Sequence, residues 1–383
     1  MVIGLDGIPL TALRTGVGHY TFELASALAR VAPETDFEVV YPSNRSPAIS
    51  GLDDSISLPA NLKIKRVKVG PVGRHWWSTG LPRYVRRSGM ELFHGTNYDV
   101  PPWRQCATVL TIHDLSLLIH PETHEKRRVS RSRGRLPLMA RAANLVIVPT
   151  ESVRGEVCNH LGLSREKVFA VPEAARECFA PMEFAATAEV RRRLGIGNDF
   201  LLTVGTIEPR KNLQTLVSAF EEVAGGQSQP TLQLVIAGSR GWLSQPFFDA
   251  LEKSPVRNRI ILTEYLNDEE LRALYSSCRA FVYPSIYEGF GLPPLEAMAC
   301  GAPVIASRIP ALEETTGGAA ILVEPGKVQE LAGAMANLLD NDDLRARLSV
   351  EGRSWAAQFT WERTARLTLD VYEQARRKWK RNA

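Results

Sequence analysis

Two glutamates bracket a glycine-rich loop in the second half of the chain. The segment Tyr287–Ser307 reads YEGFGLPPLEAMACGAPVIAS, with Glu288 at the mouth of the loop and Glu296 eight positions later, in the expected first turn of a helix. Gly289 and Gly291 allow the backbone to approach a ligand closely, and N–H groups at a helix start favour a phosphate. Carboxylates only accept hydrogen bonds, so the two glutamates suit the hydroxyl groups of a ribose and a sugar. The alternative is a surface turn with a capping glutamate.

A basic turn follows the first predicted strand of the second half. It reads GTIEPRKN from Gly205 to Asn212 and contains Arg210 and Lys211. A guanidinium fork beside an ammonium point charge can hold a diphosphate. Since cations at the start of a helix oppose its dipole, we expect an anion to compensate them here. The alternative is a solvated basic helix start.

The first half supplies a glycine loop and a histidine. The loop, TGVGH at 15–19, does not match a dinucleotide fingerprint, because Thr21 stands where a third glycine is needed and no acidic residue follows the next strand. His113 ends a strand of buried type, at a carboxyl edge where ligands bind. A lone histidine is usually structural, and the neighbouring Asp114 could either cap the following segment or orient the imidazole ring.

Neither a metal ion nor an organic cofactor is expected. His120 and His124 have helical i,i+4 spacing, but Pro121 argues against a continuous helix between them. The Asp-x-Asp pattern at 340–342 lies at a helix–helix junction, where Asp and Asn are ordinary caps. The sequence contains no Gly-x-Ser-x-Gly nucleophile motif and no phosphate-binding P-loop.

These residues must be positioned by alternating strands and helices. Short apolar runs alternate with amphipathic runs in both halves, which predicts parallel strands with helices on both faces. The predicted strands are 2–5, 37–41, 62–69, 91–94, 108–112, 145–148, 168–171, 200–204, 232–237, 260–262, 280–283, 304–306 and 320–323. The predicted helices are about 17–31, 77–88, 126–143, 152–161, 213–224, 246–253, 268–277, 295–300, 327–339, 342–359 and 361–380.

The boundary between two domains is expected within 179–198, which holds Pro181, a helical patch at 189–194 and a GIGN turn. This predicts two tandem Rossmann-like domains of the α/β class, 1–180 and 181–360, with parallel sheets facing across a cleft. In such sheets ligands bind beyond the carboxyl ends of the strands, and large pockets favour domain interfaces.

The composition is that of a globular protein. Of 383 residues, 44% are hydrophobic and 23% charged, which excludes a disordered chain, a fibre and a coiled coil. No apolar run approaches the ~18 residues that span a bilayer, and the first residues lack the basic start of a secretory signal. The five scattered cysteines suggest reduced thiols, so we expect a cytoplasmic protein.

The charge is unevenly distributed. Residues 1–180 carry 23 Lys and Arg against 17 Asp and Glu, whereas 181–383 carry 23 against 25. A basic first half suggests an anionic partner, which is a nucleic acid, an anionic membrane or a phosphate-bearing substrate. Trp and Arg gather at 74–87 and basic residues at 126–135, a pattern typical of a membrane-interface segment or of a solvated face. The sequence has no recognisable nucleic-acid module, so nucleic acid is not expected.

The glutamate-flanked loop resembles the E-x7-E signature of the retaining glycosyltransferases of family four, which have the GT-B fold. The resemblance extends over essentially the whole chain. It implies that Glu296 holds the nucleotide ribose and that Glu288 lies by the hydroxyl groups of the donor sugar. The amides that it places on the diphosphate and the sugar belong to Gly289, Phe290, Gly291 and Leu292.

The same resemblance assigns the basic turn and the first half. It implies that Arg210 and Lys211 hold the donor diphosphate. Gly16 is expected to face the donor phosphates and the acceptor, and His113 to contact the donor sugar near the reacting carbon. A terminal helix at about 361–383 is expected to pack back on the first domain.

Two departures from the family pattern stand out. Thr206 stands where many members carry an arginine, so neutralisation of the phosphates rests on the basic pair of the turn. The stretch VPEAA from Val171 stands where many relatives have Pro-Asn-Gly, near the expected domain boundary.

The implied activity is that of a metal-independent, retaining hexosyltransferase working by front-face displacement. The sequence looks most like the bacterial mannosyltransferase branch, so GDP-mannose is the first expected donor and UDP-glucose the second. The implied acceptor is a glycan or a lipid-linked acceptor of envelope polysaccharide or lipopolysaccharide synthesis. A peripheral membrane enzyme at the inner face of the cytoplasmic membrane is expected to meet it.

Two other functions remain open. A nucleotide-sugar epimerase on the same fold needs acid and base side chains in the sugar pocket in addition to His113, and the sequence shows no such set. A non-enzymatic glycan-binding or membrane-binding protein is expected to have lost Glu288, Glu296 or Lys211, and all three are present.

Overall fold

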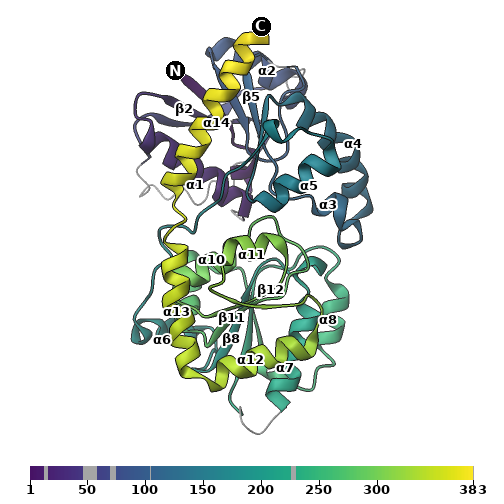
Figure 1. Cartoon of the computed structure of the whole chain (residues 1–383), viewed down its shortest axis with the longest axis vertical. Coiled ribbons are helices and arrows are strands. Elements are labelled where there is room, and N and C mark those ends of the chain that lie inside the picture. Colours follow the sequence, from purple (N-terminus) through teal and green to yellow (C-terminus); the bar gives the residue numbers. More distant parts are fainter. Residues whose placement is uncertain (13–15, 46–57, 70–74, 104, 226–229, 383) are drawn as a thin grey trace. The chain divides into compact units, whose positions relative to one another are not determined.

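The computed structural model describes residues 1–383 except 13–15, 46–57, 70–74, 104, 226–229 and 383. Two positions of the motifs above, Thr15 and Arg74, therefore lie outside the described residues. The chain divides into two compact units (Figure 1). Unit 1 comprises Met1–Leu118, Ser130–Glu173 and Thr360–Ala383, and unit 2 comprises Ile119–Val129 and Ala174–Phe359.

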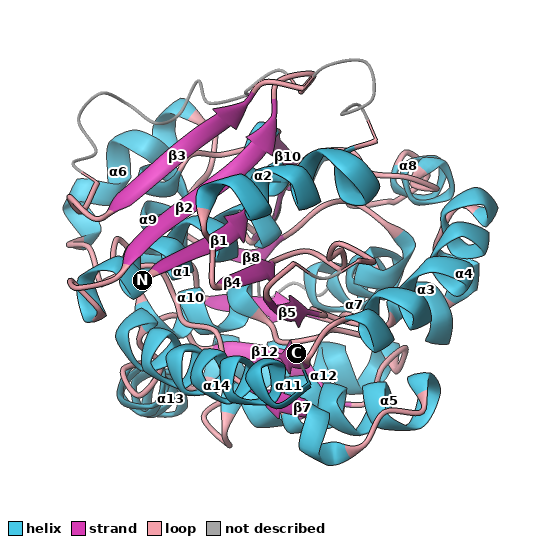
Figure 2. Cartoon of the chain, turned by 90° about the horizontal axis from the view of Figure 1, so that it is seen from above, coloured by secondary structure: helices cyan, strands magenta, loops and turns pink. Residues whose placement is uncertain are grey.

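Unit 1 is built on a parallel sheet whose described strands lie in the order β3-β2-β1-β4-β5-β6-β7. Figure 2 shows β3, β2 and β1 running side by side. The strands are β1 (Val2–Asp6), β2 (Asp36–Pro42), β3 (Leu62–Val67), β4 (Leu92–Gly95), β5 (Ala107–Thr111), β6 (Leu145–Val148) and β7 (Val168–Ala170). The helices of the first half are α1 (Gly16–Val31), α2 (Leu81–Ser88), α3 (Ser116–Ile119), α4 (Lys126–Ala142) and α5 (Glu151–Leu161), with short turns η1 (Ile8–Thr11), η2 (Trp76–Gly80), η3 (Pro121–Thr123) and η4 (Arg165–Lys167).

The last helix of the chain, α14 (Trp361–Asn382), belongs to unit 1 and packs on α1 and β5 (Figure 1). Its buried residues recur every three or four positions, as expected of a helix with one apolar stripe. They are Trp361, Thr364, Ala365, Thr368, Val371, Tyr372 and Ala375. The Tyr372 hydroxyl reaches His94 Nδ1 on β4 at 2.7 Å, which ties the helix to the middle of the sheet.

Unit 2 contains a second parallel sheet, with its described strands in the order β10-β9-β8-β11-β12-β13. The strands are β8 (Phe200–Val204), β9 (Gln233–Ala237), β10 (Ile260–Glu264), β11 (Ala280–Tyr283), β12 (Val304–Ser307) and β13 (Ile321–Val323). The helices are α6 (Phe184–Arg193), α7 (Leu213–Gly225), α8 (Gln245–Leu251), α9 (Asp268–Ser277), α10 (Leu292–Ala299), α11 (Pro310–Thr316), α12 (Val328–Asp340) and α13 (Asp342–Ala356), with short turns η5 (Pro209–Lys211) and η6 (Arg257–Arg259).

Both faces of the second sheet are buried, which explains its continuous apolar strands. Along β11, Ala280 and Val282 belong to one core cluster, whereas Phe281 and Tyr283 belong to the other. The second cluster also contains Leu295 of α10, so Tyr283 lies on the face that this helix covers.

The strand orders place the loops that matter for ligands. In unit 1 the order reverses between β1 and β4, and in unit 2 between β8 and β11. The loops that follow the two strands on either side of such a switch point run in opposite directions and form a crevice, and open α/β sheets bind their ligands there. The basic turn follows β8 and the glutamate-flanked loop follows β11, so both lie at the switch point of the second sheet.

The prediction of two parallel α/β sheets is confirmed, and each predicted strand is present within two residues of its expected bounds. Two short helices, α3 and α11, were not predicted. α10 begins at Leu292 and not at Leu295, because the proline pair occupies its first turn. Glu296 therefore lies in the second turn, and its placement in the first turn was wrong. None of the described helices combines the length and the apolar character that a membrane-spanning segment needs.

Candidate functional site

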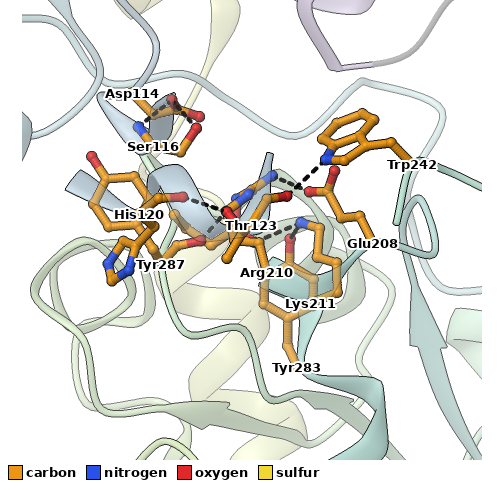
Figure 3. A network of polar contacts seen from close by, with 11 residues as sticks. Asp114, Ser116, His120, Thr123, Glu208, Arg210, Lys211, Trp242, Tyr283 and Tyr287 are labelled. Atoms are coloured by element: carbon orange, nitrogen blue, oxygen red, sulfur yellow. Dashed lines mark hydrogen bonds and ion pairs between the residues drawn. The ribbon is translucent and has the colours of Figure 1, made fainter. Parts of the chain in front are cut away.

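A buried network of four charged side chains lies at the switch point of unit 2. Lys211 Nζ donates to Glu288 Oε1 and to the Tyr283 hydroxyl, each at 2.5 Å. Arg210 donates to Glu288 Oε2 and to Glu208 Oε1, each at 2.7 Å. Figure 3 shows the two cations side by side with Glu208 and Tyr283. The network joins the loop after β8 to the loop after β11.

The turn around the two cations is fixed by its own backbone contacts. Asn212 has a φ of 53°, in the left-handed region, and its side-chain amide donates to the Pro284 carbonyl at 3.2 Å. The Ile286 N–H donates to the Arg210 carbonyl at 2.9 Å, and the Arg210 guanidinium donates to the Tyr287 carbonyl at 2.8 Å. The two loops are thereby held together by backbone bonds as well as by charge.

Burial and charge act in opposite directions within this network. Burial alone would raise the pKa of Glu288, but the charges of Arg210 and Lys211 outweigh it and lower this pKa to about 2. Burial lowers the pKa of Lys211 more than Glu288 raises it. For Glu208, burial raises the pKa more than the two cations lower it. Glu288 is thus held as a carboxylate at every ordinary pH.

The glycine loop reaches α10 through a residue in a left-handed backbone conformation. Gly291 has a φ of 111°, and a Cβ built on it lies 2.5 Å from Leu312 Cδ2, so a larger residue does not fit there. Pro293 and Pro294 carry no N–H, so among the first three residues of α10 only Leu292 can donate. An anion at this helix start must therefore rely on loop amides more than on the helix.

Glu296 faces a different cation. Arg176 Nε donates to Glu296 Oε1 at 3.1 Å, and its Nη1 donates to Asp268 Oδ1 at 2.6 Å. The Arg176 guanidinium also lies over the Phe179 ring, 4.5 Å from its centre. Burial raises the pKa of Glu296 to about 7, although the Arg176 charge lowers it. The charge of Glu296 near neutral pH therefore depends on one buried arginine.

His113 lies in unit 1, two residues after β5. Its Nδ1 is 3.2 Å from Glu173 Oε1, and its Nε2 is 2.9 Å from the Thr96 carbonyl oxygen. Asp114 accepts hydrogen bonds from the Ser116 N–H and hydroxyl at 2.9 and 2.8 Å, so it caps the following segment (Figure 3). Of the two roles left open for Asp114 the structure shows the capping one, and Glu173 is the carboxylate bonded to the ring.

The predicted site residues fall into four groups. Arg210, Lys211 and Glu288 are brought into one network, whereas Glu296 lies in the Arg176 pair of the same unit. Of the remaining predicted positions, Gly289, Phe290 and Gly291 connect Glu288 to α10, and Leu292 is the first residue of that helix. In unit 1, Gly16 is an exposed residue at the first position of α1, and His113 is bonded to Glu173.

Four side-chain partners of these residues were missed by sequence reasoning, and one of them is Glu208, which accepts from Arg210 at 2.7 Å. Tyr283 was read only as a strand end, Arg176 was not considered, and Glu173 was noted only as a departure from the family pattern. A buried carboxylate needs a hydrogen-bonding or charged partner. A search for cations and hydroxyl groups near the end of each strand could therefore have pointed to Tyr283 and Arg176.

The patterns set aside for metals have structural roles. Asn341 of the Asp-x-Asp pattern caps α13 by accepting from the Leu344 N–H at 2.9 Å. His124 stacks on Trp242, and His120 bonds to Glu122. In the described part of the chain, His, Cys, Asp and Glu side chains form no group of three that could hold a metal ion.

Comparison with known proteins decides the family. The sequence model of the family "Glycosyltransferase Family 4" matches residues 14–174, and that of "Glycosyl transferases group 1" matches residues 187–355. The chain is a family four glycosyltransferase. The O-antigen chain mannosyltransferase B of Escherichia coli is 28% identical over 95% of this chain and 97% of its own. The serotype-specific mannosyltransferase WbdA of the same species is 30% identical over 73% of this chain, which spans only 35% of that relative.

Solved structures support the GT-B fold of this glycosyltransferase. A sucrose-phosphate synthase from Thermosynechococcus elongatus has a TM-score of 0.76 and 24% identity, covering 97% of this chain and 98% of its own. HepE of Anabaena, crystallised with UDP-glucose, has a TM-score of 0.74 and 19% identity, covering 97% and 99%. The expectation of a glycosyltransferase enzyme in the mannosyltransferase branch is confirmed, and the epimerase alternative is not favoured.

Proposed function

We propose that the enzyme transfers mannose from GDP-mannose to a growing glycan of the bacterial envelope, with retention of anomeric configuration and without a metal. The observation that carries the proposal is the buried Lys211–Glu288–Arg210 network at the switch point of the second sheet. The two mannosyltransferase relatives, both named for O-antigen or serotype, support the choice of sugar and of acceptor class. A lipid-linked glycan is the expected form of that acceptor.

In this proposal unit 2 holds the donor. Arg210 and Lys211 neutralise the diphosphate, together with the amides at 289–292, and Glu288 accepts hydrogen bonds from the sugar hydroxyls. Glu296 accepts from the ribose. Gly16 and His113 of unit 1 act on the donor phosphates and on the sugar, as the family resemblance implies.

The chemistry then consists of positioning and charge stabilisation. The acceptor oxygen attacks the anomeric carbon on the face that the diphosphate leaves, the C–O bond to the phosphate breaks, and the departing phosphate takes the acceptor proton. No protein nucleophile is required, so the protein contributes cations and amides placed where negative charge develops.

A donor panel tests the proposal. Purified enzyme is incubated with a lipid-linked envelope glycan and with GDP-mannose, UDP-glucose, UDP-galactose or UDP-N-acetylglucosamine, and nucleotide release is followed. Release of GDP with a mass increase of one hexose on the acceptor, and an NMR coupling showing the donor's configuration, supports it. Release from no donor in the panel, or inversion at the anomeric carbon, contradicts it.

UDP-glucose is the second candidate donor, because a chain of the same fold was crystallised with it. The same panel separates the two, since a UDP-glucose enzyme releases UDP and leaves GDP-mannose untouched. Selectivity for one sugar nucleotide at equal concentration decides between them.

We further place the enzyme in the cytoplasm, at the inner face of the membrane. This part of the proposal rests on α4, which exposes Lys126, Arg127, Arg131 and Arg133 together with Leu138, 60% exposed. Flotation with vesicles containing anionic phospholipid tests it. Equal recovery with neutral and anionic vesicles contradicts it.

A further inference from the structure

Both ring nitrogens of His113 face hydrogen-bond acceptors. The Thr96 carbonyl, 2.9 Å from Nε2, can only accept, so Nε2 must carry a hydrogen. Nδ1 lies 3.2 Å from Glu173 Oε1, and an ionised carboxylate can also only accept. The two neighbours therefore restrict where the protons of this pair can be.

Two arrangements satisfy both contacts. In the first, His113 carries a hydrogen on each nitrogen and donates to Thr96 and to an ionised Glu173. In the second, Glu173 is protonated and donates to Nδ1 of a neutral ring. An ordinary imidazole is about two pKa units more basic than an ordinary glutamate, which favours the first arrangement before any effect of the surroundings.

The surroundings of the ring favour the same arrangement. Five titratable groups face His113. They are Glu173 in the segment after β7, Asp114 directly after His113 itself, His94 on β4, Tyr98 after β4 and Tyr20 on α1. Burial, with a smaller effect of His113, lowers the pKa of His94 to about 3, so that ring is neutral. Asp114 adds a negative charge next to His113.

These groups also explain why the pKa of His113 is raised. Burial alone would lower the pKa of His113, but Glu173, the Thr96 carbonyl and Asp114 raise it above its usual value. Two tyrosine rings limit its rotation, since the centre of Tyr20 lies 4.7 Å and that of Tyr98 5.8 Å from the imidazole centre, both at steep angles.

We propose that Glu173 is a positioning residue that holds His113 as an imidazolium, so that both ring nitrogens are hydrogen-bond donors. The functional consequence rests on the proposed role of His113 at the donor sugar. A doubly protonated ring cannot accept the acceptor's proton, and because both of its hydrogens are already donated to Thr96 and Glu173, it acts on the donor through its positive charge. This leaves the departing diphosphate as the group that takes the proton.

In this proposal, the departure from the family pattern at Glu173 changes the protonation of His113. Many relatives carry Pro-Asn-Gly where this chain has Pro172-Glu173-Ala174, and a neutral amide does not force a second proton onto the ring. Glu173 is well suited to do so, because its side chain is only 6% exposed and is shielded from solvent screening.

NMR of enzyme labelled with nitrogen-15 in its seven histidines tests the proposal without any substrate. His113→Gln identifies the signals of this residue by their loss. We expect both nitrogens of His113 to be protonated at pH 7.5. In Glu173→Gln, whose amide can donate to Nδ1, the ring should titrate about one pKa unit or more lower. A control, Glu166→Gln, changes an exposed glutamate and should leave the titration unchanged.

Two results would overturn the proposal: a His113 with one unprotonated nitrogen in the wild type at pH 7.5, or an unchanged titration in Glu173→Gln. Activity gives an independent measurement. With the donor found by the panel, Glu173→Gln should lower kcat roughly tenfold, more strongly at high pH, with little change in KM. If NMR shows an imidazolium but the enzyme uses no donor in the panel, only the proposed function is contradicted. If the enzyme is an active transferase but its His113 ring is neutral, only this inference is contradicted.

Discussion

Replacing Arg176 by methionine tests the idea that one buried cation keeps Glu296 ionised. Arg176 is 7% exposed and bonds to Glu296 at 3.1 Å and to Asp268 at 2.6 Å. Methionine has a similar length and keeps an apolar contact with the Phe179 ring, but it carries no charge. The variant leaves Glu296, itself 9% exposed, without a cation.

The magnitude follows from the burial of the pair. Removing one partner of a buried ion pair costs about 3–5 kcal/mol. The pKa of Glu296 is about 7 with Arg176 present, and burial should raise it further once the cation is gone. Below pH 7 the folded wild type and the folded variant both hold the proton, so their stabilities differ least there. Above pH 7 the wild type ionises and the variant does not, so each pH unit adds about 1.4 kcal/mol to the difference.

Thermal unfolding at pH 6 and pH 8.5 measures this effect. For a unit of this size, 3–5 kcal/mol corresponds to a midpoint lowered by about 6–20 °C, with the larger loss at the higher pH. Arg308→Met is the control, because Arg308 is 47% exposed and pairs with Glu324 at the surface, where such pairs contribute about 1 kcal/mol or less. Adding Glu296→Gln to Arg176→Met should remove the pH dependence. An equal loss at both pH values, or a loss that Glu296→Gln does not relieve, refutes the reasoning.

Three other substitutions have defined outcomes. Lys211→Ala should lower turnover by roughly 10²–10³ while circular dichroism stays native, because it removes a diphosphate cation; near-normal turnover removes Lys211 from the mechanism. Gly291→Ala should cost about 1–3 kcal/mol in urea unfolding and weaken GDP binding, since φ is 111° and a Cβ meets Leu312; unchanged stability contradicts the strain. Tyr372→Phe should cost about 1–3 kcal/mol, as it leaves buried His94 Nδ1 without its partner; Tyr41→Phe is the control.

The alternation of apolar and amphipathic runs predicted most of the fold, because the strands are short, apolar and buried on both faces. β6 reads LVIV, a short run of apolar and mostly β-branched residues, which favours a strand. All four residues are buried. α11 was missed because its seven residues, PALEETT, contain only two residues of apolar character beyond proline and end in two threonines. Its helix is held by tertiary contacts, since Leu312 is fully buried and Thr315 donates to the Phe290 carbonyl.

The candidate site was predictable in its residues and not in its contacts. Local motifs pointed to Glu288 and Lys211 because residue type and spacing limit the chemistry. The ion pair between them joins loops 77 positions apart, and Arg176 reaches Glu296 across 120 positions. Such pairs follow from strand order, which a single sequence suggests only in outline, so the partners of each charge had to come from the structure.

Charge balance in the network around Glu288 determines what a diphosphate must do on binding. Arg210 and Lys211 carry two positive charges and Glu208 and Glu288 two negative ones, all in side chains at most 13% exposed. A nucleotide diphosphate sugar brings a negative charge on each phosphate, and a buried cluster tolerates the excess only if a carboxylate takes up a proton or moves away. Glu208 is the better proton acceptor, because burial raises its pKa whereas that of Glu288 is about 2.

Donor binding should therefore be coupled to proton uptake by Glu208. Its Oε2 is buried and has no hydrogen-bond partner within the described residues, so a proton on this carboxyl disrupts no contact there. Calorimetry of GDP binding at pH 7 in two buffers of different ionisation enthalpy measures the uptake, which we expect to approach one proton, and the affinity should fall as the pH rises. Glu208→Gln should abolish the uptake and flatten the pH dependence, because an amide is neutral at every pH. If the variant takes up as many protons as the wild type, another group balances the charge and Glu208 only positions Arg210.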